Sequence, residues 1–300
     1  MAIPTDNNKN PNVNPFVKWA GGKRQLLHEI HKYVPQLNSR SKYVPKSFSQ
    51  YCEPFLGGAA LLFDLQPPDA LVNDINPELI NVYEQVRDNA DKLIRTLKQH
   101  KREYEKTGEE YFYTVRNRDR LRSFNRLSKV SRAARLIFLN KTCYNGLFRV
   151  NSRGEFNTPY GRYKNPNIIN EKTLLAVSAY LQANNISLQC TDFVELGKQI
   201  KKKAFVYADP PYHPVSGTAS FTGYAKNGFT EDDQGRLRDF CERLIVDKSC
   251  YVIVSNSFTD CIRKLYSGPR FRIKKINANR NINSVAGKRG KIPEALITGS

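Results

Sequence analysis

The stretch Asp209-Pro210-Pro211-Tyr212 combines residue types that could hold a flat aromatic amine. It follows the apolar run 204–208, whose length and composition predict a buried strand of a parallel sheet. Asp209 would then lie at the carboxyl end of that strand, where open α/β sheets bind ligands. The two prolines fix φ and remove two N–H donors, so this turn is stiff.

The turn predicts a site for an exocyclic amino group. The Asp209 carboxylate and the Pro210 carbonyl could both accept hydrogen bonds from one nitrogen, while the Tyr212 ring stacks on the base. Two acceptors direct the nitrogen lone pair towards an electrophile, and no proton need leave before the attack. The alternative is a plain strand end in which Asp209 caps a helix. The attached strand and the tyrosine favour the chemical interpretation.

Two glycine-containing stretches must position this turn. Residues 16–23 form a compact loop in which Gly21 and Gly22 let the backbone approach a ligand closely, and Trp19, the only tryptophan, is placed to stack. The spacing is not that of a Walker phosphate loop. Further on, a strand at 50–53, a glycine turn and an apolar helix at 61–65 are typical of the start of a Rossmann-like nucleotide site.

The strand predicted at 70–73 ends in Asp74. An acid at this place holds ribose hydroxyls in dinucleotide-binding folds. Asp74 could equally cap the helix that begins at Pro77, and the spacing leaves both interpretations open.

Residues 78–139 are predicted to be helical and charged, with Arg132 to Leu139 as a separate helix. Basic and aromatic residues then alternate through 140–164, where Asn-Gly and Arg-Gly mark turns, so a β-hairpin is expected. Arg149 on this hairpin could read guanine, and the aromatic residues could stack on bases. A surface hairpin with solvated charge is the alternative.

The rest of the chain alternates between helices and strands. Residues 213–229 are long enough for a mobile lid, and Lys288, Arg289 and Lys291, between two antiparallel strands in 271–297, could contact phosphates. The expected elements are a helix at 171–183, a strand at 186–190, a further helix before the strand at 204–208, a helix at 232–244, a strand at 251–255 and a helix at 259–265.

Composition limits the function classes. The 300 residues carry a net charge of +20 with a sequence pI near 9.7, which suits a polyanion, nucleic acid first. The six cysteines are scattered without a CxxC pair and there are only four histidines, so we expect neither a disulfide framework nor a metal site. No run is long enough for a membrane span, and residues 1–14 are expected to be a disordered tail of a cytosolic protein.

Several of these motifs together resemble the Dam-type DNA adenine methyltransferases, which methylate adenine N6 in GATC using S-adenosylmethionine. The resemblance covers nearly the whole chain from Pro15 onward. The motifs that carry it are Lys18-Trp19-Ala20-Gly21-Gly22-Lys23, Glu53 to Gly58, Asn145 to Asn151, Gly154 to Lys164 and Asp209 to Tyr212. The chain departs from the family pattern at Ala59, where many relatives have a third glycine, and in a longer basic segment at 38–49.

The resemblance implies an α/β fold: a Rossmann-like, S-adenosylmethionine-dependent methyltransferase sheet from 15–76 and 165–300, with an inserted, mainly helical target-recognition domain at 77–164 that carries the hairpin. It implies catalytic roles for Asp209, Pro210 and Tyr212, and cofactor contacts from Trp19, Ala20, Gly21, Lys23, Phe55, Gly57, Asp74, Asp192 and Phe193. It implies DNA contacts from Lys18, Tyr144, Asn145, Leu147, Arg149 and Pro159, to which the charge pattern adds Lys288 and Arg289.

The function predicted is methylation of adenine N6 in double-stranded DNA, with the target base flipped into the Asp209 to Tyr212 pocket. The expected enzyme is a cytoplasmic monomer of bacterial or phage origin that is associated with DNA. The sequence leaves open whether it acts alone or protects DNA beside a cognate restriction endonuclease. Other classes stay open: an RNA or protein-amide methyltransferase, a DNA-binding module without activity, and a nicotinamide-dependent enzyme that would leave Trp19 and Tyr212 unexplained.

Overall fold

The computed structural model describes residues 9–19, 21, 23–35, 46–215, 228–279 and 291–300. The predictions made for Ala20, Lys288 and Arg289 lie outside these residues. So do most of the basic segment 38–49 and most of the expected lid at 213–229.

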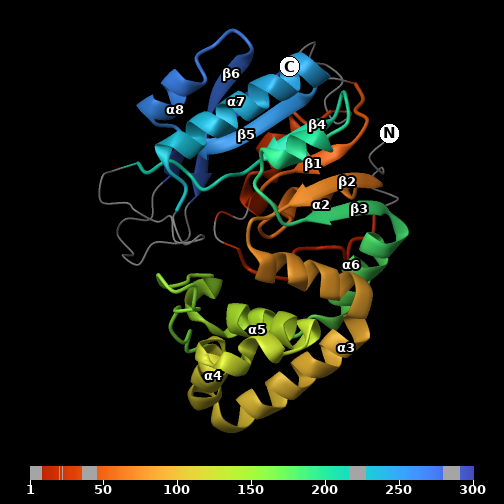
Figure 1. The fold of residues 1–300 in the computed structure, drawn as a ribbon, viewed down its shortest axis with the longest axis vertical. Helices are drawn as coiled ribbons and strands as arrows, with labels where there is room; N and C mark the ends of the chain where they lie inside the picture. The colour runs from red at the N-terminus through yellow and green to blue at the C-terminus, as the bar shows by residue number, and fades with distance from the viewer. Residues whose placement is uncertain (1–8, 20, 22, 36–45, 216–227, 280–290) are drawn as a thin grey trace.

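A seven-stranded sheet forms the centre of the molecule, with the order β3-β2-β1-β4-β5-β7-β6 (Figure 1). The first five strands in this order are parallel, and β7 is antiparallel to both β5 and β6. The strands are β1 (Tyr51–Glu53), β2 (Asp69–Asn73), β3 (Asn185–Gln189), β4 (Phe205–Ala208), β5 (Tyr251–Ser257), β6 (Phe271–Asn279) and β7 (Lys291–Gly299). The predicted mixed α/β architecture with a mostly parallel sheet is confirmed.

The strand order reverses between β1 and β4. From β1 the chain crosses to β2 on one side, and it later returns to β4 on the other side of β1. Open α/β sheets bind ligands in the crevice at such a reversal, outside the carboxyl ends of the strands. The glycine loop (Pro54 to Ala59) follows β1 and the acid turn (Asp209 to Tyr212) follows β4, so both lie at this point.

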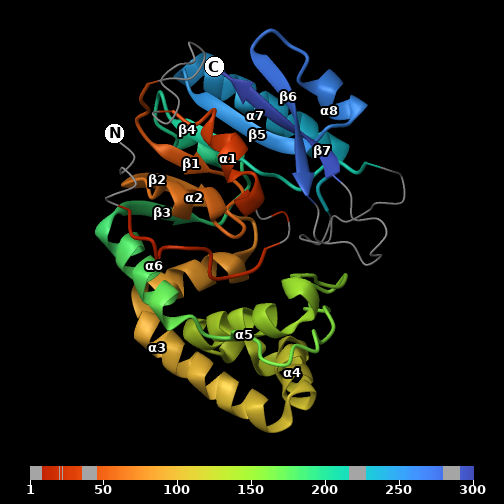
Figure 2. The same cartoon turned by 180° about the vertical axis from the view of Figure 1, so that it is seen from behind.

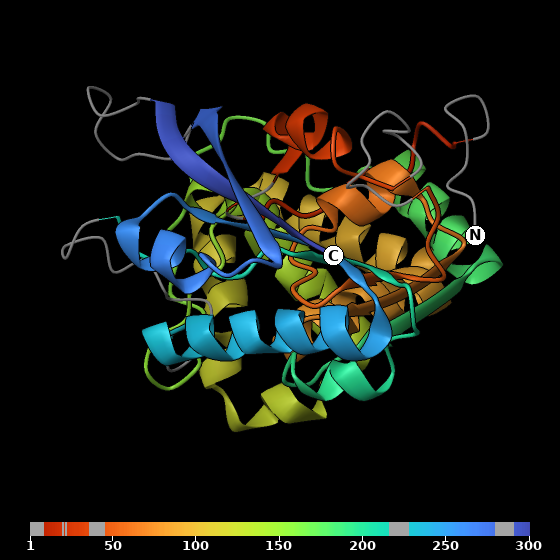
Figure 3. The same ribbon diagram turned by 90° about the horizontal axis from the view of Figure 1, so that it is seen from above.

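Each face of the sheet buries its own core because side chains alternate along a strand. In β4, Phe205 and Tyr207 pack in one core, while Val206 and Ala208 pack in the other. The helices α1 (Leu27–His31) and α2 (Ala60–Leu65) cover the first face, and α7 (Glu231–Lys248) and α8 (Asp260–Leu265) cover the second (Figures 2 and 3).

The chain between β2 and β3 forms a helical body, which lies at one end of the molecule (Figure 1). Its long helix α3 begins at Pro77, packs against α5 and α6, and has a non-helical residue at Asn89. Residues 78–139 thus form several helices, as expected from their pattern. The elements are α3 (Pro77–Thr107), α4 (Glu109–Arg116), the 3-10 helices η3 (Asn117–Arg120), η4 (Arg122–Arg126) and η5 (Tyr144–Gly146), α5 (Lys129–Thr142) and α6 (Glu171–Ala183).

The structure corrects two local predictions. Between β3 and β4 the described residues contain only the 3-10 helix η6 (Glu195–Lys198); the segment is short and has Gly197 within it, and glycine disfavours a longer helix. Part of the expected tail is packed: Asn10 and Gln66 exchange two hydrogen bonds of 3.1 and 3.0 Å, and Val13 is buried. No helix of the described residues is both long and apolar enough to cross a bilayer.

Candidate active site

Buried amides hold the acid turn from behind. Gln234 of α7 donates to the Pro211 carbonyl at 3.0 Å, and the N–H of His213 donates to Asn256 Oδ1 at 3.0 Å. Asn256 Nδ2 in turn donates to Gln234 Oε1 at 2.9 Å, and both amides are almost fully buried. The turn is therefore fixed to α7 and to the end of β5. Sequence reasoning missed both residues, since they lie 23 or more positions from the turn.

Asp209 lies in a charged environment rather than at a helix end. The first turn of α7 is capped by Thr230 and Asp233, so the cap interpretation of Asp209 is wrong. Lys23 Nζ lies 3.0 Å from Asp209 Oδ1, with one-fifth of the Asp209 side chain exposed. Burial raises the pKa of Asp209 to about 6, Lys23 opposes the rise, and the nearby Glu294 carboxylate adds to it.

Tyr212 is fixed at its hydroxyl and covered on its ring. Its hydroxyl donates to Glu294 Oε2 at 2.8 Å, and Glu294 is a buried acid on β7. Lys23 Nζ lies 4.4 Å from the ring centroid, within the range of a cation–π contact. The structure thus brings Asp209, Tyr212 and Lys23 together. It adds Glu294, which no sequence signal marked beyond its being an acid within an apolar strand.

Trp19 packs directly on the glycine loop. Gly57 has a φ of +47°, and a Cβ at this position would lie 2.9 Å from Trp19 Cδ1. The N–H of Gly57 donates to Asp74 Oδ2 at 3.0 Å, and its carbonyl accepts from Tyr83 at 2.8 Å. Glycine is required here both by the left-handed backbone and by the close approach of the indole ring.

Asp74 supports the glycine loop, and it is not the helix cap. Its second oxygen accepts from the N–H of Asn76 at 2.9 Å, and burial raises its pKa. Asn76 is the residue that caps α3, with Pro77 in the first helical turn. The capping interpretation of Asp74 is therefore wrong. The departure at Ala59 also has a structural counterpart, because this alanine adopts the left-handed conformation (φ 55°) that glycine adopts without cost.

The residues predicted to flank the cofactor's adenine lie beside an arginine. Both oxygens of Asp192 are 2.9 Å from Arg236, and the guanidinium of Arg236 lies 5.1 Å from the Phe193 ring. Phe193 is buried, with its ring centroid 5.3 Å from that of Phe55 and 6.1 Å from that of Phe229. The structure brings Phe55 and Phe193 into one aromatic cluster at the carboxyl edge of the sheet.

Asn140 joins the Trp19 loop to the 143–164 loop. Its side chain accepts from the N–H of Lys18 at 2.7 Å and donates to the carbonyls of Lys18 and Gly146 at 2.6 and 2.9 Å. Trp19 also stacks on Phe148, with centroids 5.3 Å apart and rings inclined by 21°. The predicted cofactor and DNA segments are thus neighbours, and nothing in the sequence pattern singled out this asparagine.

The 143–164 loop folds back on itself through two isolated antiparallel bridges, Cys143 with Tyr160 and Val150 with Phe156, without regular strands among the described residues. Arg149 is exposed, and its Nε donates to Asn157 Oδ1 at 2.7 Å. The remaining residues predicted to contact DNA lie on the same loop or beside it. Tyr144, Asn145 and Pro159 are exposed, Leu147 is partly exposed, and Lys18 Nζ lies 4.9 Å from the Tyr163 ring centroid.

A buried ion pair anchors this loop. Asp119 Oδ2 accepts from the N–H of Phe156 and lies 2.8 Å from Arg135, and both charged side chains are at most one-tenth exposed. Arg120 donates to the Phe156 carbonyl at 2.8 Å, while Arg135 also donates to the Val115 carbonyl. The loop is therefore tied at Phe156 to η3 and α5, although residues 152–154 beyond it are exposed.

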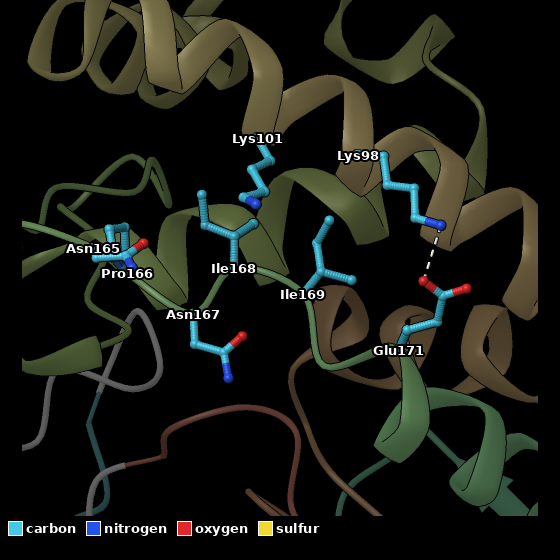
Figure 4. Close-up of a pocket in the computed structure, with 8 residues that line it drawn as sticks. All are labelled: Lys98, Lys101, Asn165, Pro166, Asn167, Ile168, Ile169 and Glu171. Carbon is cyan, nitrogen blue, oxygen red and sulfur yellow. Dashed lines mark ion pairs between the residues drawn. The ribbon is translucent and has the colours of Figure 1, made fainter.

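Two other features are a pocket away from these residues and a cluster of possible metal ligands next to the acid turn. A pocket of about 440 Å3 lies between α3 and the segment before α6, and none of the predicted site residues lines it (Figure 4). Beside the acid turn, His213, Glu231 and Cys261 each place one possible metal-ligand atom within 4.8 Å of the others. The sequence had suggested no metal site, because these residues are far apart along the chain.

The chain belongs to the D12 class of N6 adenine-specific DNA methyltransferases, because the model of that family matches residues 19–282. It is 42% identical over 287 residues to Type II methyltransferase M1.LlaDCHI of Lactococcus lactis subsp. cremoris, covering 96% of this chain and 95% of the relative. It is 33% identical to the DNA adenine methylase of Escherichia coli (strain K12), covering 94% and 93%. The predicted family and the predicted activity of a DNA adenine methyltransferase are confirmed.

Proposed function

We propose that this enzyme transfers a methyl group from S-adenosylmethionine to N6 of adenine within GATC in double-stranded DNA, and that the base is flipped into the acid turn. The arrangement of Asp209, Tyr212, Lys23 and Glu294 is the observation that carries this proposal. Flipping costs a few kcal/mol of stacking and pairing, part of which stacking on Tyr212 would return.

Two acceptors would hold the adenine amino group. Among the described residues, the Pro210 carbonyl has no hydrogen-bond partner, and the turn is braced by Gln234 and Asn256. With a pKa of about 6, Asp209 is mostly ionised at pH 7.5 and accepts the amino hydrogen. Acceptors fixed before the reaction need no reorganisation when charge develops on the nitrogen, which is the main source of rate in such a site.

The residues around the glycine loop fit the cofactor. Gly57 leaves room only for backbone beneath Trp19, Asp74 places a carboxylate beside the loop, and Phe55 and Phe193 offer aromatic surfaces. When bound, S-adenosylmethionine supplies the methyl group as an electrophile. Gly21, Lys23 and Asp192 complete the proposed contacts, together with Ala20.

Trp19 offers a direct test of this assignment. Binding of S-adenosylmethionine should change the fluorescence of this sole tryptophan, because the indole borders the proposed site. Asp74→Ala should weaken the titration by about 1–3 kcal/mol, since it removes charge-assisted hydrogen bonds. An unchanged spectrum, with binding confirmed by calorimetry, would place Trp19 outside the site.

Residues 77–164 are proposed as the target-recognition domain, inserted into a catalytic domain formed by 15–76 and 165–300. The net charge of +20 favours binding to DNA phosphates, a salt-dependent step. Arg149 would read guanine in the major groove, and Tyr144, Asn145, Leu147, Pro159 and Lys18 would contact the duplex around the flipped base.

The proposed sequence specificity can be tested on plasmid DNA. Unmethylated plasmid is incubated with the enzyme and S-adenosylmethionine, and is then digested separately with a nuclease blocked by GATC methylation and one that requires it. After treatment with the parent enzyme, the plasmid should resist the first nuclease and be cut by the second. After treatment with Asp209→Asn it should show neither change. Methylated adenine found outside GATC would refute the specificity while leaving the enzyme class intact. RNA and protein amides, offered in parallel, should remain unmethylated.

The relatives named as type II methyltransferases support a role beside a restriction endonuclease that cuts the same sequence. We further propose a monomer that acts in the cytoplasm on bacterial or phage DNA. Light scattering of the free enzyme would check the monomer, and disruption of the gene beside an intact nuclease gene would check the protective role.

A further inference from the structure

Lys23 makes contacts that a residue serving only the cofactor would not need. Its ammonium group lies 3.0 Å from Asp209 Oδ1 and 4.4 Å from the centre of the Tyr212 ring, and it donates to the Gly21 carbonyl at 2.8 Å. The side chain is only 5% exposed. One buried cation therefore touches both proposed base-binding groups of the acid turn.

Other ionisable groups face Asp209 from three strands. Glu294 of β7 raises the pKa of Asp209 because it carries a like charge, whereas Lys23 lowers that pKa. Tyr207 of β4 and Glu53 of β1 are also within electrostatic range, but burial holds the pKa of each well above its usual range. Of these groups, Lys23 and Glu294 act on the charge of Asp209 in opposite directions.

Lys23 supplies a countercharge to the Asp209 carboxylate and leaves its oxygen able to accept another hydrogen bond. Although the ammonium lies 3.0 Å away, Asp209 Oδ1 has no well-aligned hydrogen bond among the described residues. A buried carboxylate without a countercharge would take up a proton, and a carboxylate fully hydrogen-bonded to lysine would be a poor acceptor for a base. Here the Lys23 ammonium supplies the countercharge, and its alignment leaves Asp209 Oδ1 able to accept a hydrogen bond from a base.

We propose that Lys23 and Glu294 are positioning residues that set the charge state of Asp209 in opposite directions. Lys23 keeps the carboxylate ionised in the free enzyme, and Glu294 limits that effect while holding the hydroxyl of Tyr212. The proposal rests on the proposed function only in taking Asp209 as the acceptor of the adenine amino group. It assigns Lys23 a role at the reacting centre in addition to its place in the cofactor loop.

The charge of Asp209 can be measured without cofactor or DNA. Protein labelled with aspartate carrying 13C at the side-chain carboxyl is titrated by NMR, and the Asp209 signal is assigned by its absence in Asp209→Asn. Lys23→Met should raise the Asp209 midpoint by at least about 1 pH unit, since an adjacent opposite charge typically shifts a carboxyl by about 1–3 units. Glu294→Gln, which keeps an acceptor for Tyr212, should lower it.

Three controls separate this effect from structural damage. Lys198→Met removes an exposed lysine whose ion pair among the described residues is with Glu195, and it should leave the midpoint unchanged. Lys23→Arg keeps the charge and should restore most of the Lys23→Met shift. The variants are compared only where their circular dichroism and thermal midpoints match the parent, and Lys23→Gln replaces Lys23→Met if the latter fails to fold.

The two variants must move the Asp209 midpoint in opposite directions. An unchanged midpoint in Lys23→Met, or shifts of the same sign in both variants, would overturn the proposal. In single-turnover methylation the acid limb should follow the NMR midpoint of each variant. If the NMR midpoints shift as expected while methylation is independent of them, the electrostatic proposal stands and the assignment of Asp209 as the acceptor fails.

Discussion

The acid turn and the 143–164 loop are both rich in polar side chains, but they are held in different ways. The acid turn is at most partly exposed and receives contacts from α7, β5, β7 and the loop that contains Trp19 and Lys23. The tip of the 143–164 loop is exposed, and Arg149 pairs with Asn157 of the same loop. The difference indicates that the proposed reacting centre is held by the fold of the free protein, whereas the exposed part of the loop has internal contacts that bases would replace under the proposed function.

The largest effect on stability should come from breaking the Asp119–Arg135 ion pair, which holds the 143–164 loop but not the acid turn. Asp119→Ala leaves the Arg135 guanidinium buried without its carboxylate and releases the N–H of Phe156. We expect a loss of about 3–5 kcal/mol in the free energy of unfolding, measured by urea denaturation. Asp239→Ala, which removes an exposed partner of Arg238, should cost less than about 1 kcal/mol. Equal costs would contradict the buried anchor.

Loss of the acid turn should affect rate rather than binding. Asp209→Asn removes the charged acceptor and Tyr212→Ala the stacking surface, and each should slow single-turnover methyl transfer at least ~100-fold, comparable to losing one preorganised group in other sites. DNA affinity should largely persist in gel-shift assays. Asp247→Asn, at the exposed end of α7, serves as the matched control. Near-normal transfer in both acid-turn variants would remove them from the reaction.

The ionised carboxylate of Asp209 should lower the free energy of unfolding at neutral pH. Because the pKa of Asp209 is raised to about 6 in the folded protein, the fold binds this proton more tightly than the unfolded chain does. Folding is therefore penalised progressively as the pH rises from about 4 to about 6, and fully above that. Asp209→Asn should raise the free energy of unfolding by about 2–3 kcal/mol at pH 7.5 and by little at pH 4. Denaturation at both pH values tests the sign, and a gain at pH 4 alone would refute it.

Arg149 tests whether the loop tip reads bases. Arg149→Ala should lower methylation of GATC more than methylation of sites altered at the guanine. The free-energy difference by which the enzyme discriminates between these sites should shrink by about 1–3 kcal/mol. Arg153→Ala, four residues further along the exposed tip, should leave that difference intact. Lys288→Ala should weaken binding to all DNA alike and reduce the log–log salt slope by about one. A uniform loss in Arg149→Ala would make this arginine a phosphate contact.

The smallest effect concerns the glycine loop. Gly57→Ala places a Cβ 2.9 Å from Trp19 at a positive φ, so we expect a loss of about 1–2 kcal/mol in stability and a shifted tryptophan emission. Gly235→Ala is the matched control. Apart from its chain neighbours and local helix backbone, no atom of the described residues lies within 4 Å of the added Cβ, and α7 should gain up to about 1 kcal/mol in stability. The same cost at both positions would contradict the close packing of Trp19.

The sequence by itself determined the sheet, the order of its main strands and helices, and the enzyme family. These depend on local signals: apolar runs of strand length, glycines where the backbone must turn, and Asp209 to Tyr212 kept together as one motif. It also predicted the glycine turn with Gly57 and the acid Asp74 as parts of one nucleotide-type site, because a strand, a turn and a helix in series leave few ways to fold. Trp19 was joined to them only through the family resemblance.

Only the tertiary structure decided which distant residues hold that motif. Asn256 and Glu294 reach the acid turn because β5 lies next to β4 in the sheet and β7 follows β5, while Gln234 reaches it from α7, which packs on one face of the sheet. Asn140 reaches Lys18 across 122 positions. Their side-chain types are common in surfaces and turns, so no local pattern marks them. Burial then changes their chemistry: removed from water, the carboxylate of Asp209 depends on whichever charges the fold brings within a few ångströms, and that set is a property of the packed sheet.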